Sequence, residues 1–271
     1  MITVQALYIY PVKSLSGISI NTMSFDKLGP TNDRRYMLID NNENMLTQRD
    51  HPILAKFKTA INKQTLIISF ESDQIEIDMT LTGNNLLSCE VWEDRTKGSE
   101  ISQEISDWFS AKLNFKAHFI KFDQNTPRTM DRNFVDHDAQ VGFADGFQIL
   151  LTQQSSLEAL ELDKNEDMLR FRPNLVVKGE TAFSEDYWQT ININNCELAI
   201  VKPCERCTMP AVNPKDGTKQ PKVIRALAQK RLFNKGMYFG QNLVLINQNP
   251  STINIDDRVS ITNRSKHSNI T

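Results

Sequence analysis

Short runs of alternating apolar and polar residues dominate the chain and predict β-strands. The runs are rich in β-branched and aromatic residues, and turn residues separate them at intervals that suit antiparallel sheets. The predicted strands are Thr3 to Tyr10, Tyr36 to Asp40, Thr65 to Phe70, Gln74 to Ile77, Leu87 to Trp92, Ala117 to Phe122, Asn174 to Lys178, Thr190 to Ile193, Glu197 to Pro203, Asn242 to Ile246 and Arg258 to Ile261. The pattern therefore predicts an α+β fold dominated by β structure.

Three segments have the apolar spacing of helices instead. Ser102 to Leu113 places its apolar residues on one face, and Ser102 is the expected N-cap. Gln154 to Leu162 follows Thr152 in the same manner. Pro221 to Phe233 opens with a proline, which the first turn of a helix tolerates. We expect these few helices to pack against the sheets.

A polar segment, DQNTPRTMDR at Asp123 to Arg132, interrupts the periodicity and contains a proline. Such a segment is typical of a boundary between domains. We therefore expect one domain in residues 1–122 and another in residues 123–271. The last residues, Asn263 to Thr271, are expected to fray.

Composition narrows the class of protein. The 271 residues carry a net charge of −2, so the chain lacks the overall positive charge that draws proteins to nucleic acid. No apolar run approaches the roughly 20 residues that span a bilayer, and the alternating ITVQALYIY after Met1 does not resemble a signal peptide. Four cysteines in a chain of this length do not suggest a disulfide scaffold. We expect a cytoplasmic protein that binds neither nucleic acid nor membranes.

Common catalytic motifs are missing from the sequence. It contains no GxxxxGK[ST] loop, GxGxxG, HExxH or GxSxG. The four histidines, His51, His118, His137 and His267, share no ligand spacing, so we interpret them as surface or partly packed side chains.

The cysteine pair in KPCERCTM, Cys204 and Cys207, is the strongest candidate for chemistry. Its spacing suits thiol exchange, zinc binding, or one thiolate offered to a softer metal. Thiol exchange would place the pair at the start of a helix, but Pro210 and Pro214 follow too closely. A zinc site would need more ligands, of which Cys196 could supply one. The motif alone favours an inert buried pair or half of a zinc site.

Positive charge near the cysteine pair makes a chemical role for it more plausible than the motif alone does. Lys202 and Arg206 flank the thiols and favour the thiolate form. Basic residues also stand at strand entrances in three distant segments: Lys13 in YPVKSL, Arg34 and Arg35 in DRRYMLID, and Arg172 in FRPNL. Each alone is typical of a surface charge. Together they could hold a phosphate-bearing anion beside a thiolate.

The order of the motifs resembles a known family. YPVKSLSG, DRRYML, FADGFQILLT, FRPNLVV, KPCERCTMPAVNP with its following DGT, and FGQN occur in the order seen in MOSC domain proteins that carry a MOSC N-terminal β-barrel region. Within that family the sequence resembles the mitochondrial amidoxime-reducing component and the bacterial YcbX-like proteins. The resemblance extends from about Ile2 to Ile261 and implies a MOSC β-barrel preceded by a barrel-like domain.

The resemblance implies a molybdenum cofactor, a molybdopterin whose metal takes a further sulfur from the protein. By motif position that ligand and catalytic residue is Cys207, with Cys204 as a neighbour. The positions that match the family's cofactor contacts are Lys13, Ser14, Arg34, Asp145, Arg172, Asn174, Glu205 and Arg206. Glu205 stands where some relatives carry serine. Asp145 and Asp138 are candidate proton donors, and pyridoxal phosphate binding is another property associated with the family.

The reaction implied is the reductive removal of oxygen from a small N-hydroxylated substrate. Some bacterial relatives continue into a ferredoxin domain, whose cluster needs several closely spaced cysteines. No cysteine follows Cys207, so we expect a separate electron-donor protein of the ferredoxin or flavoprotein kind. Two other functions remain open: a sulfur carrier with a persulfide on Cys207, and a non-enzymatic protein that binds or stores the cofactor.

Overall fold

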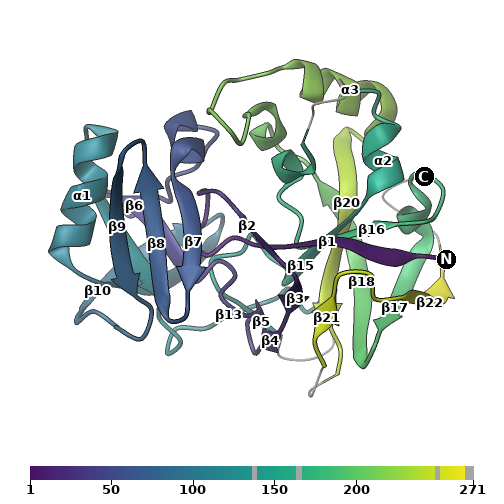
Figure 1. Ribbon diagram of the computed structural model, residues 1–271, viewed down its shortest axis with the longest axis horizontal. Helices are drawn as coiled ribbons and strands as arrows, with labels where there is room; N and C mark the ends of the chain where they lie inside the picture. Colours follow the sequence, from purple (N-terminus) through teal and green to yellow (C-terminus); the bar gives the residue numbers. More distant parts are fainter. Residues whose placement is uncertain (136–138, 163–166, 248–250, 266–271) are drawn as a thin grey trace.

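The computed structural model describes residues 1–135, 139–162, 167–247 and 251–265. These residues form the expected α+β fold with β structure predominant. Figure 1 shows two lobes, one built from smaller sheets and α1 (Gln103–Leu113) and the other from a large sheet with α2 (Gln154–Glu158) and α3 (Lys222–Arg231). The N-terminus lies on the second lobe.

The largest sheet has nine strands and supports the second lobe. Eight follow the order β2 (Ile18–Ile20), β1 (Thr3–Ile9), β16 (Leu175–Lys178), β15 (Ile149–Gln153), β20 (Gly236–Leu245), β18 (Cys196–Glu205), β17 (Trp188–Ile193) and β22 (Val259–Arg264), and β19 (Leu232–Phe233) pairs with β20. Among the described strands of this sheet, β15 and β16 are the only neighbours that pair in parallel. Strands β1 and β2 belong to this sheet although they come from residues 1–122. The N-terminal part of the chain therefore contributes two strands to a sheet formed mainly by residues 123–271.

The first lobe contains two smaller sheets. One orders β10 (Asn85–Val91), β11 (Asp94–Glu100), β12 (Ala117–Phe122) and β6 (Tyr36–Asp40), and the other orders β7 (Lys58–Asn62), β8 (Thr65–Phe70) and β9 (Asp73–Asp78). Helix α1 begins after Ser102, whose side chain accepts the N–H of Ile105, so the predicted N-cap is confirmed. Phe109 of α1 stacks on Phe119 of β12 with 5.2 Å between ring centroids, which fixes the helix on its sheet.

Short strand pairs and 3-10 turns connect the larger elements. The pairs are β3 (Thr22–Met23) with β21 (Ile253–Asn254), β4 (Phe25–Asp26) with β5 (Gly29–Pro30), and β13 (Arg128–Thr129) with β14 (Gln140–Val141). The 3-10 turns are η1 (Pro52–Lys56), η2 (Met168–Phe171), η3 (Ser184–Tyr187) and η4 (Met209–Ala211).

The helix and chain-end predictions need correction. Helix α2 ends at Glu158 rather than Leu162 because a turn follows in which Glu161 takes a left-handed φ of 54°. Thr152 lies within β15 and does not cap α2. Helix α3 ends at Arg231 because the next two residues pair with β20. The end predicted to fray contains Asn263 and Arg264, which pair with β17, while residues 266–271 lie outside the described residues.

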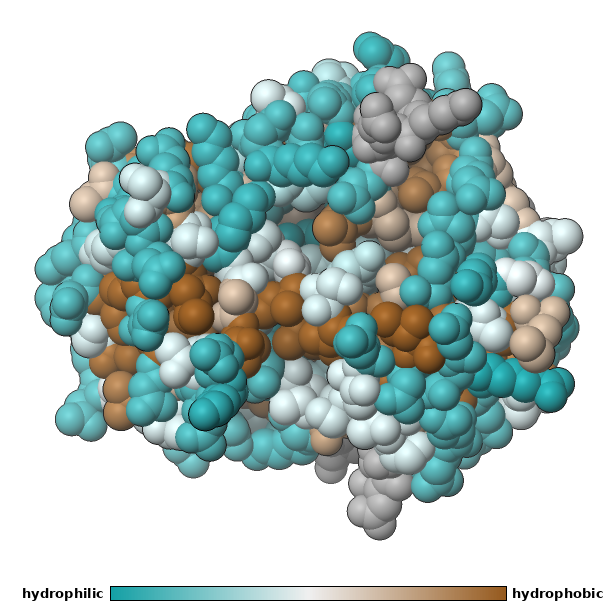
Figure 2. Space-filling view, in the orientation of Figure 1, coloured by the Kyte–Doolittle hydropathy of each residue, from teal (hydrophilic) through white to brown (hydrophobic). Residues whose placement is uncertain are grey.

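The molecular surface is mixed. On the face shown in Figure 2, hydrophobic side chains form a band across the middle, and hydrophilic side chains surround it. Among the described residues, no helix has the length and apolar composition needed to cross a bilayer.

Candidate active site

A cavity of about 740 Å³ is lined by residues of both lobes, such as Thr47 and Trp92 of the first and Cys204 and Asn242 of the second. Its volume suits a small organic ligand or cofactor. All nine site residues predicted from the sequence line this cavity: Lys13, Ser14, Arg34, Asp145, Arg172, Asn174, Glu205, Arg206 and Cys207. The fold therefore gathers motifs that stand far apart in the chain.

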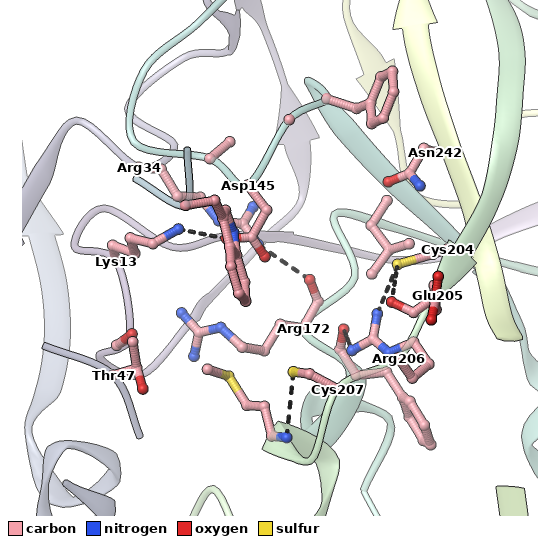
Figure 3. A pocket seen from close by; sticks show the side chains of 18 of the residues that line it. Lys13, Arg34, Thr47, Asp145, Arg172, Cys204, Glu205, Arg206, Cys207 and Asn242 are labelled. Atoms are coloured by element: carbon pink, nitrogen blue, oxygen red, sulfur yellow. Dashed lines mark hydrogen bonds and ion pairs between the residues drawn. The ribbon is translucent and has the colours of Figure 1, made fainter. Parts of the chain in front are cut away.

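The two cysteines of the pair have different surroundings (Figure 3). Cys204 is half-buried near the end of β18, and its Sγ accepts a hydrogen bond from Arg206 at 3.1 Å. Cys207 follows the strand and is exposed, and its Sγ accepts only the backbone N–H of Met209 at 3.4 Å among the described residues. Cys207 is therefore the sulfur with room for a further ligand.

Thiol exchange and zinc binding receive no support from the geometry. Cys204 lies one residue before the end of β18 rather than at the start of a helix, and the element that next follows Cys207 is the 3-10 turn η4. Cys196 is buried, and its thiol bonds to the carbonyl of Ser251 at 2.9 Å. In the described part of the chain, no three His, Cys, Asp or Glu side chains are grouped to hold a metal.

Lys13 reaches the cavity from the turn after β1. Its Nζ donates to Asp145 Oδ1 at 2.5 Å and to the Phe143 carbonyl at 2.9 Å. Burial lowers the pKa of the Lys13 ammonium, against the opposing effect of Asp145. The Asp145 side chain is exposed, and Lys13, together with the Trp92 indole at 3.0 Å, holds the pKa of its carboxyl below its usual range.

Arg34 is fixed by a buried polar cluster at the start of the next motif. Its NH1 donates to Asp33 at 2.5 Å and to Asn174 Oδ1 at 3.0 Å, and its NH2 donates to the Arg172 carbonyl. Asn174 is 2% exposed, and its amide nitrogen donates to Asp33 and to the Tyr8 carbonyl. Both ends of the Asn174 amide therefore bond to other protein groups, and its oxygen holds the Arg34 guanidinium in position.

Arg172 and Arg34 share one aromatic support. Their guanidinium carbons lie 4.2 and 4.3 Å from the centroid of the buried Tyr10 ring. Arg172 also donates to the Leu15 carbonyl at 2.6 Å. Burial lowers the pKa of the Arg172 guanidinium to about 10, so it remains charged at neutral pH.

Three of these cavity residues have strained backbones. Ser14, Arg34 and Arg172 have φ values of 67°, 50° and 54°, in the left-handed region that favours glycine. Each such residue costs on the order of 1 kcal/mol or more. Strain gathered around one cavity is typical of functional sites, where surrounding contacts hold side chains in place.

Arg206 and Glu205 complete the predicted shell beside the thiols. Arg206 NH2 donates to the Phe171 carbonyl at 2.9 Å, while its buried Nε has no partner among the described residues. Glu205 is exposed at the end of β18. Both residues line the cavity, where Glu205 contributes an anionic group and Arg206 a cationic one.

Sequence reasoning missed several residues of the site. Trp92, Thr47 and Arg49 also line the cavity. Arg128, 3% exposed, donates to the carbonyls of Gly142 and Ala144 at 2.7 Å each and pairs with Asp94. It holds the loop that carries Asp145, although its own segment has the composition of a linker. Asp138, His137 and His267 lie outside the described residues.

Comparison with known proteins agrees with this arrangement. A family model for the MOSC N-terminal beta barrel domain matches residues 1–116, and one for the MOSC domain matches residues 138–260. Mitochondrial amidoxime-reducing component 1 of Mus musculus is 30% identical over 279 aligned positions, covering 95% of this chain and 81% of that protein. The chain belongs to the MOSC family.

Other similar proteins differ in how much they share with this MOSC protein. Mitochondrial amidoxime reducing component 2 of Bos taurus is 30% identical, covering 79% of this chain and 68% of its own. The molybdenum cofactor sulfurase of Homo sapiens is 26% identical, covering 87% of this chain but 29% of its own. The solved YuaD protein of Bacillus subtilis covers 96% of this chain and 94% of its own at 11% identity, with a TM-score of 0.42.

The lining residues fit a molybdopterin-type cofactor. Of the described residues, six cationic side chains line the cavity, Lys13, Arg34, Arg49, Arg172, Lys202 and Arg206, together with three anionic ones, Glu93, Asp145 and Glu205. A surplus of guanidinium groups suits a phosphate. Cys207 adds an exposed sulfur, which is the soft type of ligand that suits the molybdenum of such a cofactor.

Proposed function

We propose that this MOSC protein is a molybdenum-cofactor-dependent reductase that removes oxygen from N-hydroxylated compounds, with electrons from a separate donor protein. The observation that carries the proposal is the shared cavity, where an exposed cysteine sulfur meets cations from three distant segments. The similarity to amidoxime-reducing components supports the reaction class. A cytoplasmic location belongs to the same proposal.

Each residue has a defined part in this proposal. Cys207 binds the metal, while Lys13, Arg34 and Arg172 bind the phosphate of the cofactor. When bound, the cofactor supplies two-electron chemistry. The polar cluster around Asn174 orients Arg34 in advance, so little side-chain entropy is lost when the anion binds.

The overall reaction balances with electrons and protons from outside the protein. An amidoxime takes up two electrons and two protons, its N–O bond breaks, and an amidine and water leave. Asp145 is ionised at neutral pH because its pKa is held low, so it anchors Lys13 and Trp92 rather than donating a proton.

The test uses protein made in a host that synthesises the cofactor. Elemental analysis should find about one molybdenum per chain, and the protein should convert benzamidoxime to benzamidine when reduced methyl viologen supplies electrons. A fully loaded and reduced sample that leaves benzamidoxime intact would contradict the enzyme proposal and favour cofactor storage.

A sulfur carrier is the second candidate. The exposure of Cys207 and the similarity to a molybdenum cofactor sulfurase over 87% of this chain favour it. Mass spectrometry of the protein would then show one added sulfur atom on Cys207 that mild reductant removes. The absence of that mass from freshly prepared protein, together with amidoxime reduction, would exclude this function.

A further inference from the structure

Trp92 occupies an unusual position at the tip of the β10–β11 hairpin. Val91 pairs with Asp94, so Trp92 and Glu93 form a two-residue loop. Trp92 takes a φ of 60° at the first loop position, where glycine is usually found. A bulky aromatic residue in this conformation is uncommon, and it departs from the local sequence rule for such turns. The chain therefore holds an indole here at a conformational cost.

The indole is also exposed at the cavity. Trp92 lines it and keeps 47% of its surface accessible, although large aromatic side chains are usually more buried. Its Nε1 donates to Asp145 Oδ1, 53 positions along the chain, at 3.0 Å. This bond fixes the ring plane while leaving apolar surface open.

Arg49 completes the arrangement. Its guanidinium carbon lies 4.4 Å from the centroid of the Trp92 ring. Within the described residues, Arg49 makes no hydrogen bond or ion pair, so its N–H donors remain available. A guanidinium over a ring presents those donors at its edge, where they can bind a carboxylate in a bidentate manner.

We infer that Trp92 and Arg49 recognise the substrate and select flat aromatic N-hydroxylated compounds that carry a carboxylate. The aromatic ring of the substrate packs edge-on against the part of the indole that Arg49 leaves exposed, and the carboxylate binds the adjacent Arg49 guanidinium. This inference rests on the proposed function because it names the substrate class of the same cavity. It assigns no chemical step to either residue.

The test measures binding rather than turnover, by isothermal titration calorimetry on cofactor-loaded protein. The ligands are 4-carboxybenzamidoxime, benzamidoxime and acetamidoxime. The wild type should bind the three in that order of affinity. Trp92→Gly suits the left-handed backbone, and it should lower the preference for benzamidoxime over acetamidoxime by about five- to tenfold. Arg49→Gln should lower the preference for the carboxylated ligand over benzamidoxime by about tenfold.

Two further variants serve as controls. Trp92→Phe retains a ring without the indole N–H and should keep most of the aromatic preference. Trp108→Phe changes a tryptophan that packs against Phe57 and Phe109 away from the cavity and should leave both ratios unchanged.

The outcomes separate this inference from the proposed function. Ratios that stay within about twofold in Trp92→Gly and Arg49→Gln would overturn the inference. Wild-type protein that binds none of the three ligands would overturn it too. Wild-type protein that binds them in the expected order but reduces none would contradict only the proposed reaction.

Discussion

Two polar clusters of this protein differ in how completely their charges are paired. The closed cluster, formed by Glu185, Asp186, Arg231, Gln153 and Gln241, is buried, and each of its charged side chains bonds to others within it. The cavity cluster, formed by Lys13, Arg34, Arg172, Asp145 and Arg206, borders open space and has a surplus of cations. Paired buried charges serve the fold, whereas a cationic surplus beside a cavity is available to an anionic ligand.

The two clusters also differ in backbone conformation. Arg34 and Arg172 of the cavity cluster have left-handed φ values, while Glu185, Asp186 and Arg231 do not. A left-handed arginine lowers stability and persists only where its surroundings enforce it. Strain and unpaired charge therefore coincide at the cavity, which is the physical basis for assigning function there.

The largest effect is expected from breaking the closed cluster. Arg231→Met leaves the buried Asp186 without its ion pair at 2.8 Å and should lower the free energy of unfolding by about 3 to 5 kcal/mol. Denaturant unfolding measures this. The double variant Arg231→Met with Asp186→Asn removes both charges and should recover much of the loss. A small effect of the single variant would show that the pair contributes little.

A pH effect in the same cluster is next in size. Burial raises the pKa of Glu185 to about 7, above its ordinary value of 4.5. The folded state therefore holds a proton that the unfolded state releases, so stability falls as pH rises from about 4.5 through 7. Glu185→Gln keeps a neutral group there and should remove most of this loss, which is roughly 3 kcal/mol. Urea unfolding at acidic and alkaline pH measures it, and parallel pH profiles for both proteins would contradict the assignment.

A smaller effect, on ligand retention, is expected in the cavity cluster. Arg172→Ala should weaken cofactor retention by about 1.5 to 3 kcal/mol because a charged hydrogen bond to the phosphate is lost. Molybdenum content after dialysis, compared with the thermal stability of the cofactor-free protein, separates retention from folding. Unchanged occupancy would remove Arg172 from the cofactor shell.

The sequence predicted those strands whose apolar alternation is strong. Thr3 to Tyr10 corresponds to β1, in which alternate residues such as Leu7 and Ile9 are buried. The sequence did not predict β11, DRTKGSE, because its charged residues carry no strand signal and its pairing with β10 and β12 holds it in the sheet. Tertiary pairing overrides local propensity in such strands.

In the candidate site, too, the sequence predicted residues that stand in local patterns and missed residues that depend on distant contacts. Cys207 and the cationic residues stand in short motifs that can be recognised in the sequence. Trp92 contacts Asp145, which lies 53 positions away in the chain. Arg128 contacts the carbonyls of Ala144 and Asp145, which lie 16 and 17 positions away. No local pattern encodes such contacts, because they arise only when the two lobes fold together.

The most direct measurement of the central claim compares the molybdenum content of Cys207→Ser and Cys204→Ser proteins produced in a host that makes the cofactor. A serine at position 204 can still accept the Arg206 hydrogen bond through its hydroxyl oxygen. A serine at position 207 would replace the soft sulfur with a hard oxygen, which is a weaker ligand for the metal. We predict that Cys207→Ser loses its molybdenum and that Cys204→Ser retains much of it. Equal molybdenum content in the two purified variants would contradict the assignment of Cys207 as the metal ligand.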